Sequence, residues 1–350
     1  MATIALTEHC SLLLDTQGVV WGSGSNHGGE LGSTDDDILY QHKKISDLPT
    51  ILGVYGGRGC SYFIDESYDV WACGDNTHGR LGNGRPLAEK TFYFTPTKIA
   101  NIPKIQAIAA NSQRHSVFID VDGDAWFVGE DSSKKTFRKP VKLPDLPTIQ
   151  AAAIAEHEAV LLDVNGQVWI GQLDKAPKLV QNLPPIIAVE HGHRTMLLDE
   201  RGFVWSNGAF NIETHQNRFD WRREAAVVES FSNFTKSELV SDIMQISYTK
   251  FHSLFRTADD AVLSWGKLSR NTVKPELERL ELPPIKSVIA GPSQSMFVDE
   301  AGVVHVQGEN MSHALGVHSA YVITPEPIED IPAIVPQNCL QSTHTKSARK

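Results

Sequence analysis

The sequence predicts an all-β fold made of seven similar units, and two observations support this prediction. A short segment with an aliphatic residue, proline, a variable residue and isoleucine recurs along the chain. Each segment is associated with a longer apolar pattern that has a turn signal at its centre. Such regular recurrence indicates a repeat architecture, and the repeat has to be recognised before any other feature is interpreted.

The short segment occurs as Leu-Pro-Thr-Ile at 48–51 and again, unchanged, at 146–149. Four other copies keep the proline and the isoleucine, and a weaker copy without proline falls in the longest gap. The four copies occupy residues 102–105, 183–186, 282–285 and 331–334, and the weaker copy occupies residues 243–246. Proline is tolerated at a strand edge or start, where no ladder N–H is needed. We therefore expect this segment, here called the linker segment, to lead from one unit into the next.

The longer pattern has an apolar run, the motif Asp-x-x-Gly and a second run that carries an aromatic residue. Its first copy reads SLLLDTQGVVWGSG from Ser11. Six of the seven copies have the Asp, with Thr257 as the exception, and five have the Gly. An Asp side chain accepts backbone N–H groups in a tight turn, and Gly readily adopts positive φ. Each unit is therefore predicted to contain a β-hairpin.

Five copies place a tryptophan six residues after the Asp, namely Trp21, Trp71, Trp126, Trp169 and Trp205. We interpret these large rings as filling the space between adjacent sheets rather than as stacking surfaces for a ligand. The corresponding Asp positions lie 36 to 58 residues apart, which suits four short strands per unit.

Seven four-stranded sheets cannot each bury both faces alone, but a radial arrangement lets neighbouring sheets cover one another. The predicted fold is therefore a seven-bladed β-propeller of four-stranded blades, which spans residues 1–336. We expect the ring to close where strands around Pro327–Val335 share a blade with residues 3–14, because this pairing hides both sheet edges. Residues 337–350 are predicted to form a flexible C-terminal tail.

The composition limits the function classes. The chain is 41% hydrophobic and 21% charged, with a formal net charge of −10. No concentrated basic run is present, so we do not expect nucleic-acid binding by the chain itself. It contains no 18-residue apolar run for a transmembrane segment and no signal-peptide pattern at its N-terminus. Four cysteines without CxxC spacing indicate reduced thiols. We expect a monomer.

Motifs for covalent chemistry, metals or cofactors are weak. GSGSNHG at 22–28 is similar to a phosphate-binding loop, but no helical pattern follows it. His191 and His193 have the spacing of two metal ligands, without a cysteine or carboxylate at a convincing distance. We therefore predict no metal, no cofactor and no catalytic residue for a covalent step.

Three copies continue past the hairpin in a fuller form: GSNHGGELG (24–32), GDNTHGRLG (74–82) and GENMSHALG (308–316). Together with His115-Ser116 and His252-Ser253, they resemble the regulator of chromosome condensation repeat, a family of seven-bladed propellers. The resemblance covers about residues 2–336, although copies four to six lack the fuller segment. The founding member is a nucleotide-exchange factor for the small GTPase Ran. Relatives include ubiquitin-ligase domains, bacterial effectors that engage host Ran and a secreted β-lactamase inhibitor, and the fold does not choose among these functions.

The resemblance also implies a partner-binding face, because the exchange factor's contact residues cluster in the loop before each inner apolar strand. The matching residues are Glu8, His9, Arg58, Arg114, His115, Glu156, His157, His193, Arg194, Lys250 and His252. His115 and His252 occupy the repeat's own structural position, where a ring nitrogen would satisfy nearby backbone. His9, His157 and His193 stand one residue earlier and are candidates for a titratable binding ring.

The exchange factor also has acidic loop residues and a β-wedge that acts at the nucleotide site, and no wedge can be matched here. Two insertions are candidates for its role. They contain aromatic and Arg residues of the kind favoured as interface anchors: Phe92, Tyr93 and Phe94 in 84–97, and Phe219, Trp221 and Arg222 in 217–234. The alternative is that the first insertion is an outer strand of blade two and the second caps the rim.

Two functions remain open. The chain engages a small GTPase of the Ran class and promotes guanine-nucleotide exchange, or it is a non-catalytic interaction scaffold for such a GTPase or another protein. Exchange would be a coupling of two binding equilibria rather than covalent chemistry. We expect a cytoplasmic or nuclear location. Delivery into a host cell by a signal-peptide-independent route, as for a bacterial effector, remains open as well.

Overall fold

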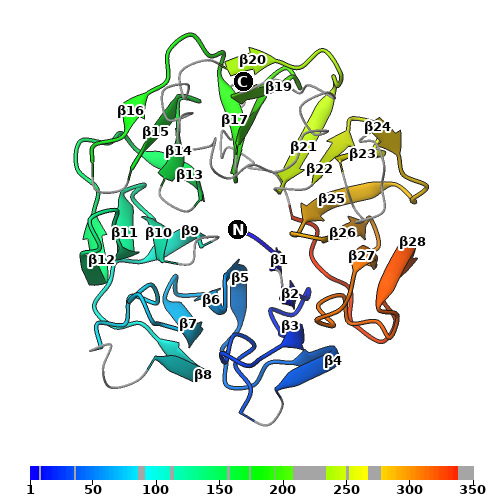
Figure 1. Cartoon of the computed structure of the whole chain (residues 1–350), viewed down its shortest axis with the longest axis horizontal. Coiled ribbons are helices and arrows are strands. Elements are labelled where there is room, and N and C mark those ends of the chain that lie inside the picture. Colours follow the sequence, from blue (N-terminus) through cyan, green and yellow to red (C-terminus); the bar gives the residue numbers. More distant parts are fainter. Residues whose placement is uncertain are drawn as a thin grey trace, which may run out of the picture.

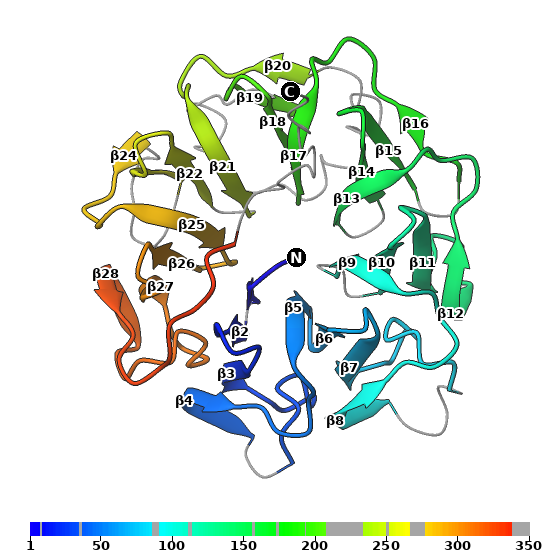
Figure 2. The same cartoon turned by 180° about the vertical axis from the view of Figure 1, so that it is seen from behind.

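The computed structural model contains seven four-stranded antiparallel sheets arranged as a ring around a central axis (Figures 1 and 2). It describes residues 1–7, 9–34, 37–85, 91–110, 114–155, 158–172, 175–192, 194–207, 234–249, 252–266 and 277–337. Within each sheet the strands follow one another in sequence order from the axis to the rim. The predicted all-β propeller with seven blades is therefore confirmed. In the described part of the chain no helix is long and apolar enough to cross a membrane.

Each blade consists of four consecutive strands, of which the first is innermost and the last lies at the rim. The first four blades are β1 (Ile4–Leu6), β2 (Cys10–Leu14), β3 (Val20–Ser25) and β4 (Ile38–Lys44); β5 (Ile51–Gly57), β6 (Cys60–Asp65), β7 (Val70–Asp75) and β8 (Phe92–Lys98); β9 (Ile105–Ala109), β10 (His115–Asp120), β11 (Ala125–Glu130) and β12 (Thr136–Lys142); β13 (Ile149–Ile154), β14 (Glu158–Asp163), β15 (Val168–Gln172) and β16 (Lys178–Leu179). The last three blades are β17 (Ile186–His191), β18 (Thr195–Asp199), β19 (Val204–Asn207) and β20 (Phe234–Lys236); β21 (Ile243–Tyr248), β22 (His252–Thr257), β23 (Val262–Gly266) and β24 (Leu277–Arg279); β25 (Ile285–Ala290), β26 (Gln294–Asp299), β27 (Val304–Glu309) and β28 (Tyr321–Pro327).

The core lies between the blades rather than inside any one of them. The second strands β2, β6 and β10 are buried along their whole length, as their apolar runs without alternation predict. One cluster joins Leu12 and Leu14 of the first blade to Val54 and Phe63 of the second. Each blade thus depends on its neighbours to exclude water from its faces.

The repeated Asp and Trp form one local unit that stabilises five of the seven hairpins. Oδ1 of Asp120 accepts the backbone N–H groups of Asp122 and Asp124 at 3.0 and 2.8 Å. Oδ2 of the same carboxylate accepts the indole N–H of Trp126 at 2.8 Å. Trp126 is half-buried and packs against the cluster between blades two and three, which confirms the predicted packing of the ring between sheets. The indole hydrogen bond was not predicted.

Segments from the two ends of the chain close the ring in the first blade. Ile334 pairs with Asp15, the residue that directly follows β2, and Ile4 pairs with Leu13 of β2. In the second blade the corresponding innermost strand is continuous, because Ile51 and Val54 of β5 pair with Asp65 and Phe63. The innermost strand of the first blade is therefore assembled from two separate segments. This result confirms that segments from both ends of the chain share the first blade. The C-terminal segment that takes part is shorter than predicted, because β28, which ends at Pro327, belongs to the last blade.

The linker segments connect one blade to the next through their last residue. The backbone N–H of Ile149 donates to the carbonyl of Gly123 in the hairpin turn of the preceding blade at 2.8 Å. Ile334 makes the same contact with Gly302 at 2.9 Å. Each linker segment thus ties the start of an innermost strand to the preceding hairpin, as the repeated sequence indicated.

Candidate protein-binding face and central cavity

The predicted partner-binding residues belong to one side of the ring, here called the loop face. Consecutive strands in each blade are antiparallel, so the first and third connections of every blade emerge on the same side, opposite the hairpin turns. The described residues of the first connections are 7, 9, 58–59, 110, 114, 155, 192, 194, 249 and 291–293. Contacts between blades occur on this side too, because His9 Nδ1 lies 3.3 Å from Ser312 Oγ in the last blade.

A glycine near the end of the third strand fixes several of these loops. The carbonyl of Arg114 accepts the backbone N–H of Glu130 at 2.9 Å. Gly129 precedes this donor with φ of +109°, and a Cβ at this position would overlap the Arg114 carbonyl oxygen. Gly24 and Gly74 show the same close approach to His9 and Gly59. Glycine is thus required there both for its backbone conformation and for space.

The predicted residues divide into surface and buried groups. His9 and Arg58 are exposed, and Arg114 and Arg194 are partly exposed. His115 and His252 are only 2% and 1% exposed. The remaining loop candidates, Glu8, Glu156, His157, His193 and Lys250, lie outside the described residues.

The two buried histidines contact protein rather than solvent. His252 Nε2 lies 2.8 Å from Ser295 Oγ of the neighbouring blade, and burial lowers the pKa of the imidazole to about 4. His115 packs against Phe127, with 5.7 Å between the ring centroids. These contacts support a structural role for both rings.

A charged cluster joins blades two and three on the loop face. The carboxylate of Glu130 forms an ion pair with the guanidinium of Arg114, and its Oε2 lies 3.2 Å from His78 Nδ1. Burial acts to raise the pKa of Glu130, but hydrogen bonds from His78 and Arg114 outweigh this effect and lower it. Sequence reasoning identified Arg114 but missed its partners, which belong to third connections and strand ends rather than to the first connections.

A buried arginine supports the neighbouring loop. Arg80 is 2% exposed, and its Nη2 lies 2.5 Å from Asp75 Oδ2 while its Nε donates to the Asp75 carbonyl at 2.9 Å. The backbone N–H of Asp75 donates to the Gly59 carbonyl at 2.8 Å. The Arg80 carbonyl accepts the hydroxyl of Tyr62 at 2.7 Å. The exposed Arg58 is therefore adjacent to a rigid, hydrogen-bonded base.

The first candidate insertion is an ordinary part of its blade. Phe92, Tyr93 and Phe94 begin β8, which pairs with β7 as the outer strand of blade two. Tyr93 is 4% exposed, whereas Phe92 is 42% exposed. The outer-strand alternative therefore describes this segment. Phe219, Trp221 and Arg222 of the second insertion lie outside the described residues.

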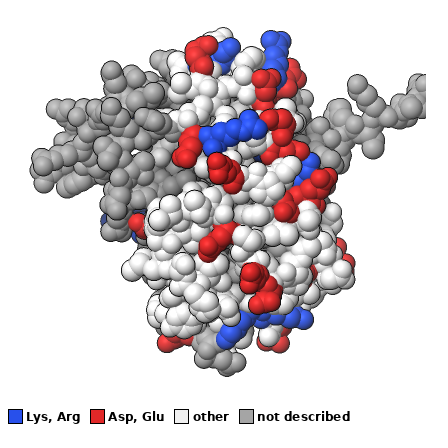
Figure 3. Space-filling model, turned by 90° about the vertical axis from the view of Figure 1, so that its right-hand side faces the viewer, with Lys and Arg blue, Asp and Glu red and all other residues white. Residues whose placement is uncertain are grey.

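One side of the rim, where the last two blades lie, shows acidic and basic side chains interspersed over an uncharged surface (Figure 3). Several of these charges are paired. Lys286 Nζ lies 2.7 Å from Asp260 Oδ2, and Arg279 Nη2 lies 3.1 Å from Asp259 Oδ2. On this side the rim therefore lacks the continuous basic surface that a nucleic-acid backbone requires.

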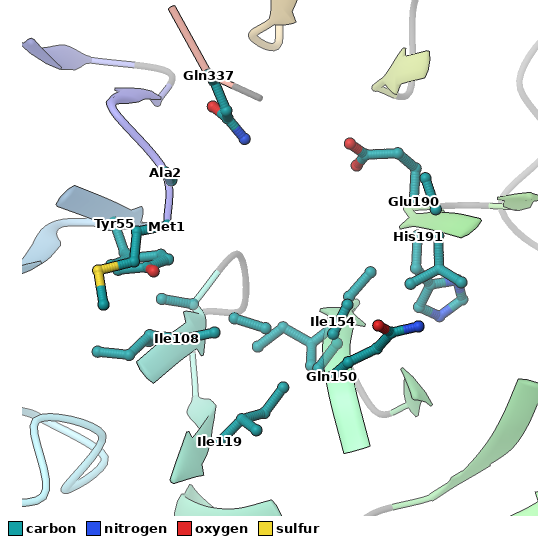
Figure 4. A pocket seen from close by; sticks show the side chains of 18 of the residues that line it. Met1, Ala2, Tyr55, Ile108, Ile119, Gln150, Ile154, Glu190, His191 and Gln337 are labelled. Carbon is teal, nitrogen blue, oxygen red and sulfur yellow. The ribbon is translucent and has the colours of Figure 1, made fainter. Parts of the chain in front are cut away.

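A cavity of about 570 Å³ occupies the centre of the ring (Figure 4). It is lined by residues of β9, β13, β17 and β21, by Tyr55 of β5, by residues 1–3 and by residues 335–337. Alanine and isoleucine side chains make up much of its wall, and the polar residues include Gln150, Glu190 and Gln337. Burial raises the pKa of Glu190 to about 8. Among the described residues, no group of three or more His, Cys, Asp and Glu side chains is arranged to hold a metal.

Comparisons with known proteins agree with this geometry. The family model of the regulator of chromosome condensation (RCC1) repeat matches residues 69–119, which run from the hairpin turn of blade two to the second strand of blade three. The alignment with the solved structure of Prp20p from Saccharomyces cerevisiae covers 91% of this chain and 87% of Prp20p, with a TM-score of 0.75 and 18% identity. The alignment with the structure of human WBSCR16 covers 89% of this chain and 94% of WBSCR16, with a TM-score of 0.72 and 15% identity. At these identities the structural likeness establishes the fold alone.

Curated relatives differ widely in length. The human E3 ubiquitin-protein ligase HERC2 is 23% identical over 335 residues, which are 84% of this chain but only 7% of the ligase. The mitochondrial RCC1 domain-containing protein RUG3 of Arabidopsis thaliana is 24% identical, over 88% of this chain and 81% of that protein. The guanine nucleotide exchange factor SRM1 of Saccharomyces cerevisiae is 26% identical, over 46% of this chain and 36% of that protein. The chain is therefore a seven-bladed β-propeller that is similar to RCC1-like proteins and contains one stretch, residues 69–119, that matches the RCC1 repeat model.

Proposed function

We propose that this propeller binds a small GTPase of the Ran class through its loop face and promotes the release of the bound guanine nucleotide. The observation that carries the proposal is the likeness of the whole ring to Prp20p, whose structure was reported together with binding to Gsp1p and histones. The sequence similarity to SRM1, an exchange factor by name, supports the same activity.

The loop face has features that suit a protein partner. Arg58, Arg114 and Arg194 lie there, and arginine is favoured at the centre of interfaces because its planar guanidinium both stacks and makes several hydrogen bonds. Arg114 is oriented by Glu130, so less side-chain entropy is lost when a partner binds. These arginines would contact acidic or carbonyl-rich segments of the GTPase.

Exchange requires only that the propeller binds the nucleotide-free GTPase more tightly than the loaded form. By linkage, the nucleotide then binds the propeller complex more weakly by the same factor. A coupling of about 1–3 kcal/mol changes affinity by about 5- to 150-fold. No covalent step is involved, so the loop face supplies binding energy rather than acid–base groups.

A second function, binding without exchange, is favoured by one observation. The aromatic run Phe92–Phe94 is an outer strand of blade two, so it does not provide the projecting wedge that would act at a nucleotide site. In this case the propeller would hold a GTPase or another protein without changing nucleotide affinity.

The release of fluorescently labelled GDP from Ran, followed at increasing propeller concentration, tests the first function. Faster release that saturates with propeller supports exchange. Unchanged release accompanied by binding in a sedimentation or calorimetric assay supports the scaffold. Unchanged release without binding overturns both forms of the proposal for Ran.

The binding face is tested by reversing the charges of Arg58, Arg114 and Arg194 together. We expect this variant to lose GTPase binding while its far-UV circular dichroism stays unchanged. A matched control reverses Arg201 at a hairpin turn on the opposite face and Lys44 and Lys178 on outer strands, all of them exposed. Equal loss of binding in both variants would assign the effect to net charge rather than to the loop face.

A further inference from the structure

The central cavity contains a carboxylate that sets one blade apart from the other six. Each innermost strand pairs with the second strand of its blade, so this pairing identifies which residues occupy equivalent positions in the seven blades. Glu190 pairs with Met196, and its equivalents pair with the matching residues of the other second strands. The equivalents are Ala5, Tyr55, Ala109, Ala153, Ser247 and Ile289. Only the fifth blade has an acidic residue at this position.

The carboxylate extends into the cavity and lacks a counter-ion there. Figure 4 shows it extending from β17 toward the middle of the opening, with the amide of Gln337 reaching in from another side. In the described part of the chain, no lysine or arginine lines the cavity, and the side chain of Glu190 forms no hydrogen bond or ion pair. A carboxylate among alanines and isoleucines is poorly solvated, so it favours any cation that can enter.

The other titratable groups of the wall do not supply this cation. The imidazole of His191 is buried, and its Nδ1 lies 3.0 Å from Thr195 Oγ1. Burial lowers the pKa of the Met1 amino group and raises the pKa of the Tyr55 hydroxyl, so both are shifted toward their neutral forms. Burial therefore disfavours a positive charge on the Met1 amino group, so this group is a poor counter-ion for Glu190.

We propose that the central cavity binds a small primary alkylamine in its ammonium form, with Glu190 as the counter-ion and the apolar wall around the alkyl body. The cavity volume of about 570 Å³ falls in the range that is usual for small-molecule sites. An ammonium group carries three N–H donors. The carboxylate of Glu190 and the side-chain amide oxygens of the wall are acceptors for them, and Gln150 is available because its Nε2 already donates to the Asp163 carbonyl at 2.9 Å.

Binding of the amine has a proton signature that hydrophobic binding lacks. Because burial raises the pKa of Glu190 to about 8, the protonated form of this carboxyl group is favoured at pH 7. An adjacent ammonium group stabilises the carboxylate and lowers this pKa, so binding at pH 7 is expected to release protons. The binding enthalpy measured in phosphate and in Tris buffer, which differ in ionisation enthalpy, reports this release directly.

The experiment is calorimetric titration of the propeller alone with cyclohexylmethylamine, and with the neutral isostere cyclohexylmethanol. We expect saturable binding of the amine with proton release and clearly weaker binding of the alcohol. Replacement E190Q should weaken amine binding by about 10- to 100-fold and abolish the proton release, because it removes the charged acceptor. The control E200Q makes the same change at an exposed hairpin position of the same blade and should leave amine binding unchanged.

Equal affinity for the amine and the alcohol, or equal amine affinity of E190Q and wild type, would overturn the proposal. So would an absence of amine binding at millimolar concentration. Glutamine has the size of a protonated glutamate, and a thermal unfolding curve checks that E190Q remains folded. No GTPase is present in this assay, so its outcome is independent of the proposed exchange activity.

Discussion

Ile334 pairs through its backbone with Asp15, 319 positions away in the sequence, and this bridge lies in the blade that also contains Ile4. The Ile334 side chain is fully buried in the cluster between the last blade and the first, together with Leu13 and Met296. The bridge therefore holds the ring closed both by hydrogen bonding and by packing. The other blade interfaces join segments that are neighbours in sequence, so this interface is the one place where closure depends on residues far apart in the chain.

Ile334→Ala should destabilise the ring by about 2–5 kcal/mol, because it leaves a cavity in a fully buried interface. The matched control is Ile323→Ala on β28, where the side chain is 75% exposed and the expected change is within about 0.5 kcal/mol. Equilibrium unfolding in urea measures both values. Equal losses for the two variants would show that closure at Ile334 does not limit stability.

Trp126→Phe should lower stability by about 1–3 kcal/mol, because Oδ2 of Asp120 loses its indole donor in a partly buried site. Asp120→Asn should be similarly harmful, since an amide group facing the indole N–H replaces an acceptor by a donor. In a double-mutant cycle the two changes should show a coupling of at least about 0.5 kcal/mol. Purely additive effects would argue that the hydrogen bond contributes nothing beyond the packing of the ring.

His252 should make stability depend on pH. Its folded-state pKa of about 4 lies below the ordinary value of about 6.5, so the unfolded chain binds a proton more readily between these values. The neutral ring therefore contributes stability that is fully present above about pH 6.5 and is lost as pH falls toward 4. The loss amounts to about 3 kcal/mol at most.

This dependence is measured by urea unfolding between pH 4 and 7. His252→Gln should flatten the slope of the unfolding free energy against pH, and glutamine is the residue that Gln294 provides at the equivalent position of the last blade. His318→Gln changes an exposed histidine and should leave the slope unaltered. An unchanged slope in His252→Gln would mean that the ring titrates normally in the folded protein.

Gly129→Ala should be much more harmful than Gly59→Ala, although both glycines have positive φ. Alanine at Gly59 meets no atom closer than 3.8 Å, so only the backbone conformation is strained, by about 1–2 kcal/mol. Alanine at Gly129 is strained in the same way and also overlaps the Arg114 carbonyl oxygen. Thermal unfolding should therefore rank wild type above Gly59→Ala and Gly59→Ala above Gly129→Ala. The reverse order of the two variants would contradict the role assigned to the close approach.

The same glycine links stability to the proposed function. Displacement of the Arg114 loop should disturb the ion pair with Glu130 and so weaken GTPase binding in Gly129→Ala at temperatures where the variant is still folded. Gly59→Ala should show a smaller loss of binding, because a Cβ at Gly59 meets no atom closer than 3.8 Å.

Repetition made the fold accessible to sequence reasoning. Seven copies of one pattern indicated both the strands and their number, since Asp-x-x-Gly marked each hairpin and the linker segment marked each crossing between blades. Even the sixth blade, where Thr257 replaces the Asp, follows the same plan, because the Thr257 hydroxyl accepts the backbone N–H of Ala261 at 3.1 Å. Local turn chemistry is specified by residues close in sequence, so it could be predicted from the sequence.

The functional features were less accessible because they depend on contacts between blades. The sequence placed Arg114 in a surface loop, but nothing near it indicated Glu130 or His78 as partners. The loop sequences favoured a structural position for His115 and His252 but left a binding role open, and the structure shows that both side chains are buried. Glu190 could have been noticed by aligning the innermost strands, but its position in a cavity that no described lysine or arginine lines could not.

The sequence by itself determined the blades, their order and their hairpins, because each of these rests mainly on hydrogen bonds and apolar patterns within one repeat. The tertiary structure decided which polar side chains are buried, which are paired and which border the central cavity. The physical reason is that in a ring of thin sheets every buried surface lies between two blades. The environment of a side chain is therefore set by a neighbour that its own repeat does not encode.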